Sequence, residues 1–176
     1  MNWERIRNAI SKRTKAILVN TPHNPTGYVW TQNDWDQLAA IIDGRDIYVV
    51  SDEVYYGIVF DGRQHIPGFL QSSFKNKIIS IYSFGKAFHI TGWKIGFCVA
   101  SEAITEAFRS IHQYLTFSVN TPAQYALAQY LRIYDPQEAA RMLQAKRDLL
   151  IDGLKPSLLG PLETSAGTYF QLYDYS

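Results

Sequence analysis

The amino-acid sequence predicts an α/β fold, built on a mostly parallel sheet with one antiparallel strand. Short continuous apolar runs, typical of strands buried on both faces, alternate with segments whose apolar residues recur at helical spacing. A helical segment joins the first two runs, and parallel strands need a crossover of this length. The last link between strands is about a dozen residues without helical pattern, which is short for a crossover and favours a reversed strand.

Four apolar runs are predicted to be strands: residues 16–20, 47–51, 78–82 and 95–100. Thr31 and Asp34 have the pattern of a capping box, which begins a helix between the first two strands. The segment 53–77 is predicted to be mostly loop, with room for one short helix. It is long enough for a second crossover, so the first three strands are expected to be parallel and the fourth antiparallel.

The second half of the chain is predicted to be helical. Apolar residues recur at helical spacing from 104 to 115, and capping-box patterns at Thr121 and Asp135 begin two further helices, the second ending near Gly153. Proline and glycine then indicate a linker, and residues 168–173 alternate like a strand. We therefore predict that residues 1–155 are the central part of a large domain, and residues 156–176 a linker and the first strand of a truncated C-terminal small domain.

The composition excludes several classes of protein. The chain has 176 residues, of which 47% are hydrophobic and 19% charged, with a net charge of +1. It has no basic run that suggests a nucleic-acid surface and no apolar stretch that approaches bilayer-spanning length. The N-terminal residues are too polar for a secretory signal, and the single cysteine, Cys98, cannot form an internal disulfide. We expect a cytoplasmic protein that binds neither nucleic acid nor membrane.

Lys86 has the setting of a reactive amine. It follows the third predicted strand in a glycine-bearing segment that we expect to be a loop, and Lys94 lies in the same segment. Desolvation and a neighbouring positive charge both favour the neutral amine, which attacks carbonyl carbon to form a Schiff base. A solvated loop lysine is the alternative for Lys86 considered alone.

Polar residues follow each of the three parallel strands. An amide-rich loop begins at Asn20 after the first strand, Asp52 follows the second, and Ser83 and Lys86 follow the third. Ligands of parallel sheets bind outside the carboxyl ends of the strands, so these groups should meet at one edge. A lysine, a carboxylate for a ring nitrogen and donors for a phosphate are the groups that pyridoxal 5'-phosphate requires.

Three segments carry a family resemblance: NTPHNPTG at 20–27, SDEVY at 51–55 and SFGK at 83–86. Together they resemble the class I/II pyridoxal-phosphate-dependent aminotransferases of the aspartate-aminotransferase fold, in the order and at about the spacing of that family. The resemblance extends to residues 167–170. It implies the large-domain core of a fold type I enzyme, truncated at both ends, that converts an L-amino acid to its 2-oxo acid through an aldimine at Lys86.

The resemblance also implies roles for individual residues. Lys86 is the catalytic residue that holds the cofactor and later moves the proton. Asp52 pairs with the ring nitrogen, and Asn24 and Tyr55 donate to the ring hydroxylate. Taken alone, Asp52 could cap a helix, Tyr55 is one of 12 tyrosines, and the 20–27 segment could be an ordinary turn.

Ser83 and Lys94 are implied to hold the cofactor phosphate, although Ser83 alone could simply end a strand. Much of the family has arginine where this chain has Lys94, and lysine offers a point charge in place of a planar fork. The TGWK form at 91–94 is similar to the branch of kynurenine, glutamine-phenylpyruvate and methionine aminotransferases. That branch implies an aromatic or sulfur-containing amino acid as substrate.

The chain matches about half of a family member, so we expect a fragment of a longer protein. The family implies a homodimer, and much of the dimer surface would be missing here, as would other substrate-binding parts. The isolated chain is expected to have doubtful activity. The four histidines lack metal-ligand spacing, so no metal site is expected.

Three alternatives remain open. A pyridoxal-phosphate-dependent carbon–sulfur lyase on the same fold shares much of the motif set. A serine acylase is suggested by Ser83 and Lys86 spaced as Ser-x-x-Lys, but the companion motifs of that class do not occur. The third alternative is a catalytically inactive fragment that serves as an interaction module.

Overall fold

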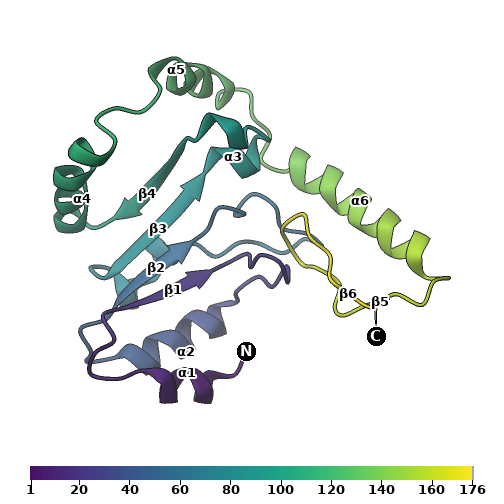
Figure 1. Ribbon diagram of the computed structural model, residues 1–176, viewed down its shortest axis with the longest axis horizontal. Helices are drawn as coiled ribbons and strands as arrows, with labels where there is room; N and C mark the ends of the chain where they lie inside the picture. The colour runs from purple at the N-terminus through teal and green to yellow at the C-terminus, as the bar shows by residue number, and fades with distance from the viewer. Residues whose placement is uncertain (176) are drawn as a thin grey trace.

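A four-stranded sheet forms the centre of the structure, a computed structural model that describes residues 1–175. Its strands are β1 (Ala16–Asn20), β2 (Tyr48–Asp52), β3 (Ile78–Ser83) and β4 (Gly96–Ala100), in that spatial order (Figure 1). β1, β2 and β3 are parallel, and β4 is antiparallel to β3. The strand directions predicted from the connection lengths are therefore confirmed.

The register aligns the ends of the parallel strands. Asn20, the last residue of β1, pairs with Asp52, the last residue of β2, and Asp52 pairs in turn with Ile81 of β3. Ser83 ends β3 two positions later. The segments that leave these three strands therefore begin at one edge of the sheet.

The main core lies between the sheet and two helices, α1 (Trp3–Ala9) and α2 (Gln32–Ile42), which cover one face (Figure 1). The capping box predicted for Thr31 and Asp34 is present and begins α2. Trp35 of α2 is 1% exposed and packs edge to face against Trp30, with ring centroids 4.7 Å apart. Burial of such large aromatic residues is the main source of stability for this layer.

The remaining helices are α3 (Phe84–Ala87), α4 (Glu102–Leu115), α5 (Thr121–Tyr130) and α6 (Glu138–Leu154), with short 3₁₀ helices η1 (Gly68–Leu70), η2 (Ser72–Phe74) and η3 (Thr91–Trp93). Three of them, α4, α5 and α6, lie where the sequence predicts helices, whereas α3 and η3 lie in a segment predicted to be a loop. Segment 53–77 thus holds two short helices, where one was expected. α1 was not predicted, because its apolar residues are few and none is buried.

Two predicted helix caps are wrong in detail. Asn120, not Thr121, caps α5, since its side chain accepts a hydrogen bond from the backbone N–H of Ala123. The Asp135 carboxylate accepts from the backbone N–H of Gln137 and so forms a turn before α6, which begins at Glu138. Asn and Asp side chains readily form such hydrogen bonds with nearby backbone N–H groups. The exact first residue of a helix is therefore difficult to predict from sequence.

The strand predicted over residues 168–173 is wrong. Instead, β5 (Gly160–Pro161) pairs antiparallel with β6 (Tyr173–Asp174). Thr168 has φ of +66°, which interrupts any extended run through this segment. The division into residues 1–155 and 156–176 as parts of two domains stays a prediction.

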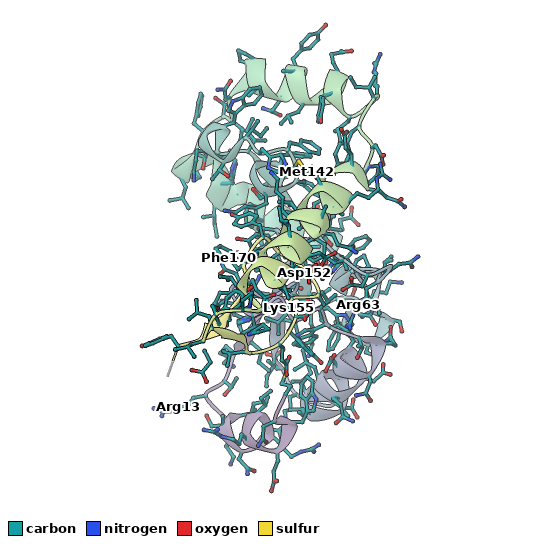
Figure 2. All side chains as sticks on the ribbon, turned by 90° about the vertical axis from the view of Figure 1, so that its right-hand side faces the viewer. Arg13, Arg63, Met142, Asp152, Lys155 and Phe170 are labelled. Atoms are coloured by element: carbon teal, nitrogen blue, oxygen red, sulfur yellow. The ribbon has the colours of Figure 1, made fainter. Side chains whose placement is uncertain are left out.

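Residues 165–168 form what we call the C-terminal strap. The N–H of Ala166 donates to the carbonyl of Gly27 at 3.1 Å, and the N–H of Thr168 donates to the carbonyl of Ile58 at 2.9 Å. The guanidinium of Arg147, on α6, donates to the carbonyl of Ser165 at 2.6 Å. Figure 2, viewed from the side of α6, shows this helix crossing the middle of the molecule near Phe170. The strap thus joins the C-terminal segment to the carboxyl edge of the sheet.

Helices in residues 1–175 all lack the combination of length and apolar character that crossing a membrane requires.

Candidate active site

Lys86 lies on α3, a single helical turn, where the sequence predicts a loop. The Ser83 hydroxyl caps this turn by accepting from the N–H of Gly85 at 3.1 Å, which explains why the chain turns helical directly after β3. Gly85 is required by packing, since a Cβ there would lie 2.9 Å from the Cα of Thr91. Lys86 is half-buried, and its Nζ donates to the hydroxyl of Tyr169 at 3.1 Å.

A chain of hydrogen bonds connects the loop after β1 to this lysine. The side-chain amide of Asn24 donates to the hydroxyl of Tyr55 at 3.4 Å, and Tyr55 donates to the hydroxyl of Tyr169 at 3.4 Å. Tyr169 accepts from Lys86 in turn. These hydrogen bonds bring together Asn24, Tyr55 and Lys86, which follow three different strands.

Asp52 is held at the same edge by backbone contacts. Its carbonyl accepts from the side-chain amide of Asn20 at 2.9 Å, and its carboxylate accepts from the N–H of Val54 at 3.3 Å. Burial, the hydrogen bond with Tyr169 and the nearby charge of Asp52 together raise the pKa of Tyr55 above its ordinary range. Tyr55 therefore stays a neutral hydrogen-bond donor beside a carboxylate.

The two residues predicted to hold a phosphate lie on either side of η3. Ser83 is half-buried at the start of α3. Lys94 is exposed and ends η3 in the left-handed conformation, with φ of +56°. The Thr91 hydroxyl donates to the carbonyl of Gly85 at 3.1 Å and ties η3 to α3. In the described residues, Lys94 forms no ion pair, so its ammonium is available to an anion.

A buried carboxylate next to Asp52 was not singled out from the sequence. Glu53 is fully buried and accepts from the hydroxyl of Tyr82 at 2.8 Å and the N–H of Gly68 at 3.0 Å, and it pairs with the ring of His65. Burial opposes the charged form of Glu53, but the His65 contact and the Tyr82 bond outweigh it and hold the pKa of Glu53 below its ordinary value. Its position directly after a buried strand was the one available signal.

Tyr169 was also missed, since its segment was interpreted as a strand of another domain. It contacts Tyr55 and Lys86 only because the C-terminal strap returns to the sheet edge.

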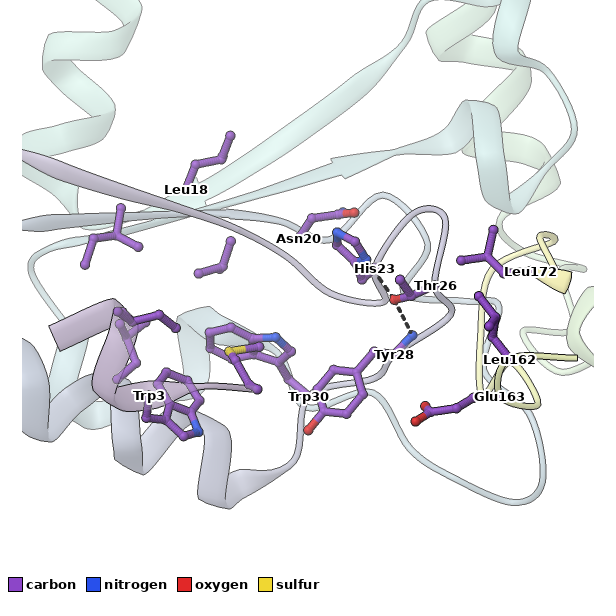
Figure 3. Close-up of a pocket in the computed structure, with 15 residues that line it drawn as sticks. Trp3, Leu18, Asn20, His23, Thr26, Tyr28, Trp30, Leu162, Glu163 and Leu172 are labelled. Atoms are coloured by element: carbon purple, nitrogen blue, oxygen red, sulfur yellow. Dashed lines mark hydrogen bonds between the residues drawn. The ribbon is translucent and has the colours of Figure 1, made fainter. Parts of the chain in front are cut away.

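A separate apolar cavity of about 950 Å³ lies beside β1 (Figure 3). Trp3 and Trp30 line one end, Leu162 and Leu172 the other, and His23 near the middle contacts the Thr26 hydroxyl at 2.8 Å. None of the residues in the hydrogen-bond chain to Lys86 lines this cavity. Within residues 1–175, no group of three or more His, Cys, Asp or Glu side chains is arranged to hold a metal ion.

The chain is similar to known proteins over its whole length. The sequence profile of a family described as "Aminotransferase class I and II" matches residues 1–175. The chain is 43% identical to a methionine aminotransferase of Escherichia coli, covering all of this chain and 46% of that protein. It is 39% identical to a kynurenine–oxoglutarate transaminase of Dictyostelium discoideum, covering all of this chain and 42% of that protein.

Solved structures agree with these relatives. An Escherichia coli protein described as having a methionine aminotransferase function superposes with a TM-score of 0.94 at 42% identity, covering 99% of this chain and 46% of that one. An N-succinyldiaminopimelate aminotransferase of Mycobacterium tuberculosis gives a TM-score of 0.90 at 33% identity, covering 96% of this chain and 44% of that one. The chain thus spans less than half the length of the relatives it matches.

We predict that Glu53→Gln lowers the free energy of unfolding by about 3 kcal/mol at neutral pH, because it removes one partner of a buried pair. Since the pKa of Glu53 is lowered in the fold, its contribution is complete above the unfolded value of 4.5 and is lost as pH falls through the folded value. Urea unfolding measured as a function of pH should show the gap between variant and parent closing in acid.

The control is Glu106→Gln, at an exposed position on α4, which should match the parent at every pH. A constant gap between Glu53→Gln and the parent down to strong acid would contradict the assignment of an ionised Glu53.

Proposed function

Because this chain belongs to the class I and II aminotransferase family, we propose that the whole protein moves the amino group of an L-amino acid to a 2-oxo acid. The family depends on pyridoxal phosphate, and we propose that this chain supplies most of the groups that bind it. The observation that carries the proposal is the hydrogen-bond chain from Asn24 through Tyr55 and Tyr169 to Lys86, with Asp52 beside it.

The donor set fits this cofactor. Lys86 offers an amine to the aldehyde carbon, and no acidic side chain in residues 1–175 forms an ion pair with it. Asp52 offers a carboxylate to the ring nitrogen. Asn24 and the neutral hydroxyl of Tyr55 offer two donors to the ring oxygen. Ser83 and the unpaired Lys94 offer a hydroxyl and a positive charge to the phosphate.

When bound, pyridoxal phosphate supplies an electron sink for the bond between the substrate Cα and its hydrogen. Asp52 supports this chemistry by holding a proton on the ring nitrogen, since a carboxylate at short range favours the positively charged ring. Asn24 and Tyr55 stabilise negative charge on the ring oxygen. Lys86 Nζ accepts the proton from Cα and delivers it again, because the amine is half-buried at the same edge.

For the substrate, we propose an L-amino acid with a large aromatic or sulfur-containing side chain. The support is the similarity to proteins named methionine aminotransferase and kynurenine–oxoglutarate transaminase. The acceptor is a 2-oxo acid. A carbon–sulfur lyase is the competing activity, and it is distinguished by release of pyruvate from cystathionine without any amino acceptor.

We also propose a cytoplasmic homodimer for the whole protein. The support for a dimer is the exposed apolar face of α4, where Phe108, Ile111 and Leu115 are 47%, 61% and 80% exposed. Monomeric proteins rarely leave such a face uncovered. The support for the compartment is the single, unpaired Cys98.

We predict that the chain incubated with pyridoxal phosphate gains a visible absorption band that Lys86→Ala lacks. Borohydride should fix the cofactor to Lys86, which mass spectrometry of the digested protein would locate. In the whole protein, turnover of L-methionine should fall by at least about 10²–10⁴-fold, the range contributed by one acid–base group. Lys75→Ala, at an exposed position, is the matched control and should keep both properties. A band that survives in Lys86→Ala would show that another amine binds the cofactor.

We predict that in the whole protein Asp52→Asn still binds pyridoxal phosphate but loses about 100-fold in kcat, a typical cost of removing one preorganised electrostatic group. Asparagine keeps the size of the side chain but cannot stabilise a positive ring nitrogen. Steady-state rates with L-methionine and a 2-oxo acid measure the effect. A variant that keeps a rate near that of the parent would remove the proposed role of Asp52.

A further inference from the structure

The hydroxyl of Tyr169 contacts the Lys86 amine directly. Lys86 Nζ donates to it at 3.1 Å and lies 5.8 Å from the centroid of the Tyr169 ring and 5.7 Å from that of Tyr55. The two rings meet edge to face at 5.3 Å. The amine is therefore held between two aromatic rings by a single oxygen that also accepts from Tyr55.

The backbone fixes where this hydroxyl lies. The C-terminal strap, residues 165–168, is bonded on both sides, to Gly27 and to the segment 58–60. Gly27 has φ of +70°, and a Cβ there would lie 1.9 Å from the Ser165 hydroxyl oxygen, so the strap packs against bare backbone. Arg147, itself held by Asp61, donates to the carbonyl of Ser165. Tyr169 follows directly and has little freedom to leave Lys86.

The electrostatics of the two tyrosines are opposite. Burial opposes ionisation of Tyr169, but hydrogen bonds from Tyr55 and Lys86 and the charge of Lys86 outweigh it and lower the pKa of Tyr169. Burial, Tyr169 and Asp52 raise the pKa of Tyr55. Tyr55 is thus the donor and the Tyr169 oxygen the acceptor that faces the amine. No other titratable group acts appreciably on Tyr169 in the described residues.

We propose that Tyr169 is a positioning residue for Lys86: its hydroxyl oxygen holds the amine at the edge of the sheet and sets the direction in which the nitrogen points. The role rests on the proposed function, because it matters only if Lys86 carries the chemistry. An unrestrained lysine side chain must give up several rotamers before its amine can react, which costs conformational entropy. A hydrogen bond that already fixes the amine removes most of this cost.

The first experiment uses the chain without cofactor and follows tyrosinate absorbance during a pH titration. Subtracting the Tyr169→Phe curve from the parent curve isolates one tyrosine, which should titrate below the ordinary value of 10.0. In Lys86→Met the midpoint of this tyrosine should move upward, because the positive charge and its hydrogen bond are gone. Tyr125→Phe, at an exposed position on α5, is the matched control for loss of one tyrosine away from Lys86.

The second experiment measures the reactivity of Lys86 in Tyr169→Phe, which keeps the ring and loses only the oxygen. Acylation of Lys86 by excess acetic anhydride should become about 2- to 10-fold faster, the factor corresponding to one net hydrogen bond. Formation of the bond between Lys86 and added pyridoxal phosphate should become slower by a similar factor. Acylation and bond formation with pyridoxal phosphate are thus expected to change in opposite directions if Tyr169→Phe only removes the orientation of the amine. A general loosening of the structure around Lys86 would make both reactions faster.

Two results would overturn the proposal. One is a tyrosine midpoint that does not respond to Lys86→Met, which would mean that the two side chains do not interact. The other is a change of equal sign in both Lys86 reactions. The titration needs no cofactor, so failure of the whole protein to bind pyridoxal phosphate would refute the proposed function while leaving the contact between Tyr169 and Lys86 separately measurable.

Discussion

Parallel pairing of β1, β2 and β3 brings the ends of these strands to one edge of the sheet, and the candidate site is built from the segments that leave those ends. The register pairs Asn20 with Asp52 and Asp52 with Ile81, so the segments begin within a few residues of one another across the sheet. An antiparallel strand in the middle of this set would move Asp52 to the opposite edge, far from Lys86. The relative positions of the candidate site residues therefore follow from the direction of the strands.

Polar groups at this edge are held in place by hydrogen bonds to one another, which form without a ligand. Asn20 bridges the carbonyl of Asp52 and the N–H of Asn24, which fixes the loop after β1 against β2. Glu53, one residue beyond Asp52, is held below the edge by Tyr82 and His65. The two consecutive carboxylates, Asp52 and Glu53, thus have different structural roles. The fully buried Glu53 anchors the chain, and the partly exposed Asp52 stays available to a ligand.

Much of this arrangement could be predicted from local patterns. Strand direction follows from the lengths of the connections, and the start of α2 follows from Thr31 and Asp34, because both depend on residues close in sequence. Lys86, Asp52 and the loop that holds Asn24 could be grouped because each follows a strand, whereas Tyr55 was placed with them only by the resemblance. The roles carried to Ser83 and Lys94 rest on resemblance, since within residues 1–175 no hydrogen bond or ion pair joins either side chain to the hydrogen-bond chain at Lys86.

Residues that meet across long stretches of sequence could not be predicted. Tyr169 and Lys86 are separated by 83 positions, and their contact depends on a strap whose backbone bonds reach Gly27 and Ile58. The alternating apolar residues of 168–173 predicted a strand, but the positive φ of Thr168 and the backbone bonds of the strap to neighbouring loops prevent an extended run. The pairing of Glu53 with His65 was missed for the same reason, because nothing local marks His65 as buried.

Asp52 and Lys86 are proposed to face a single cofactor ring from the ends of adjacent strands. NMR of bound pyridoxal phosphate, isotope-labelled at the ring nitrogen, tests this most directly. We expect a protonated ring nitrogen in the parent and in Asp46→Asn, whose exposed carboxylate lies before β2, and an unprotonated one in Asp52→Asn at the same neutral pH. An identical chemical shift in all three proteins would contradict the account.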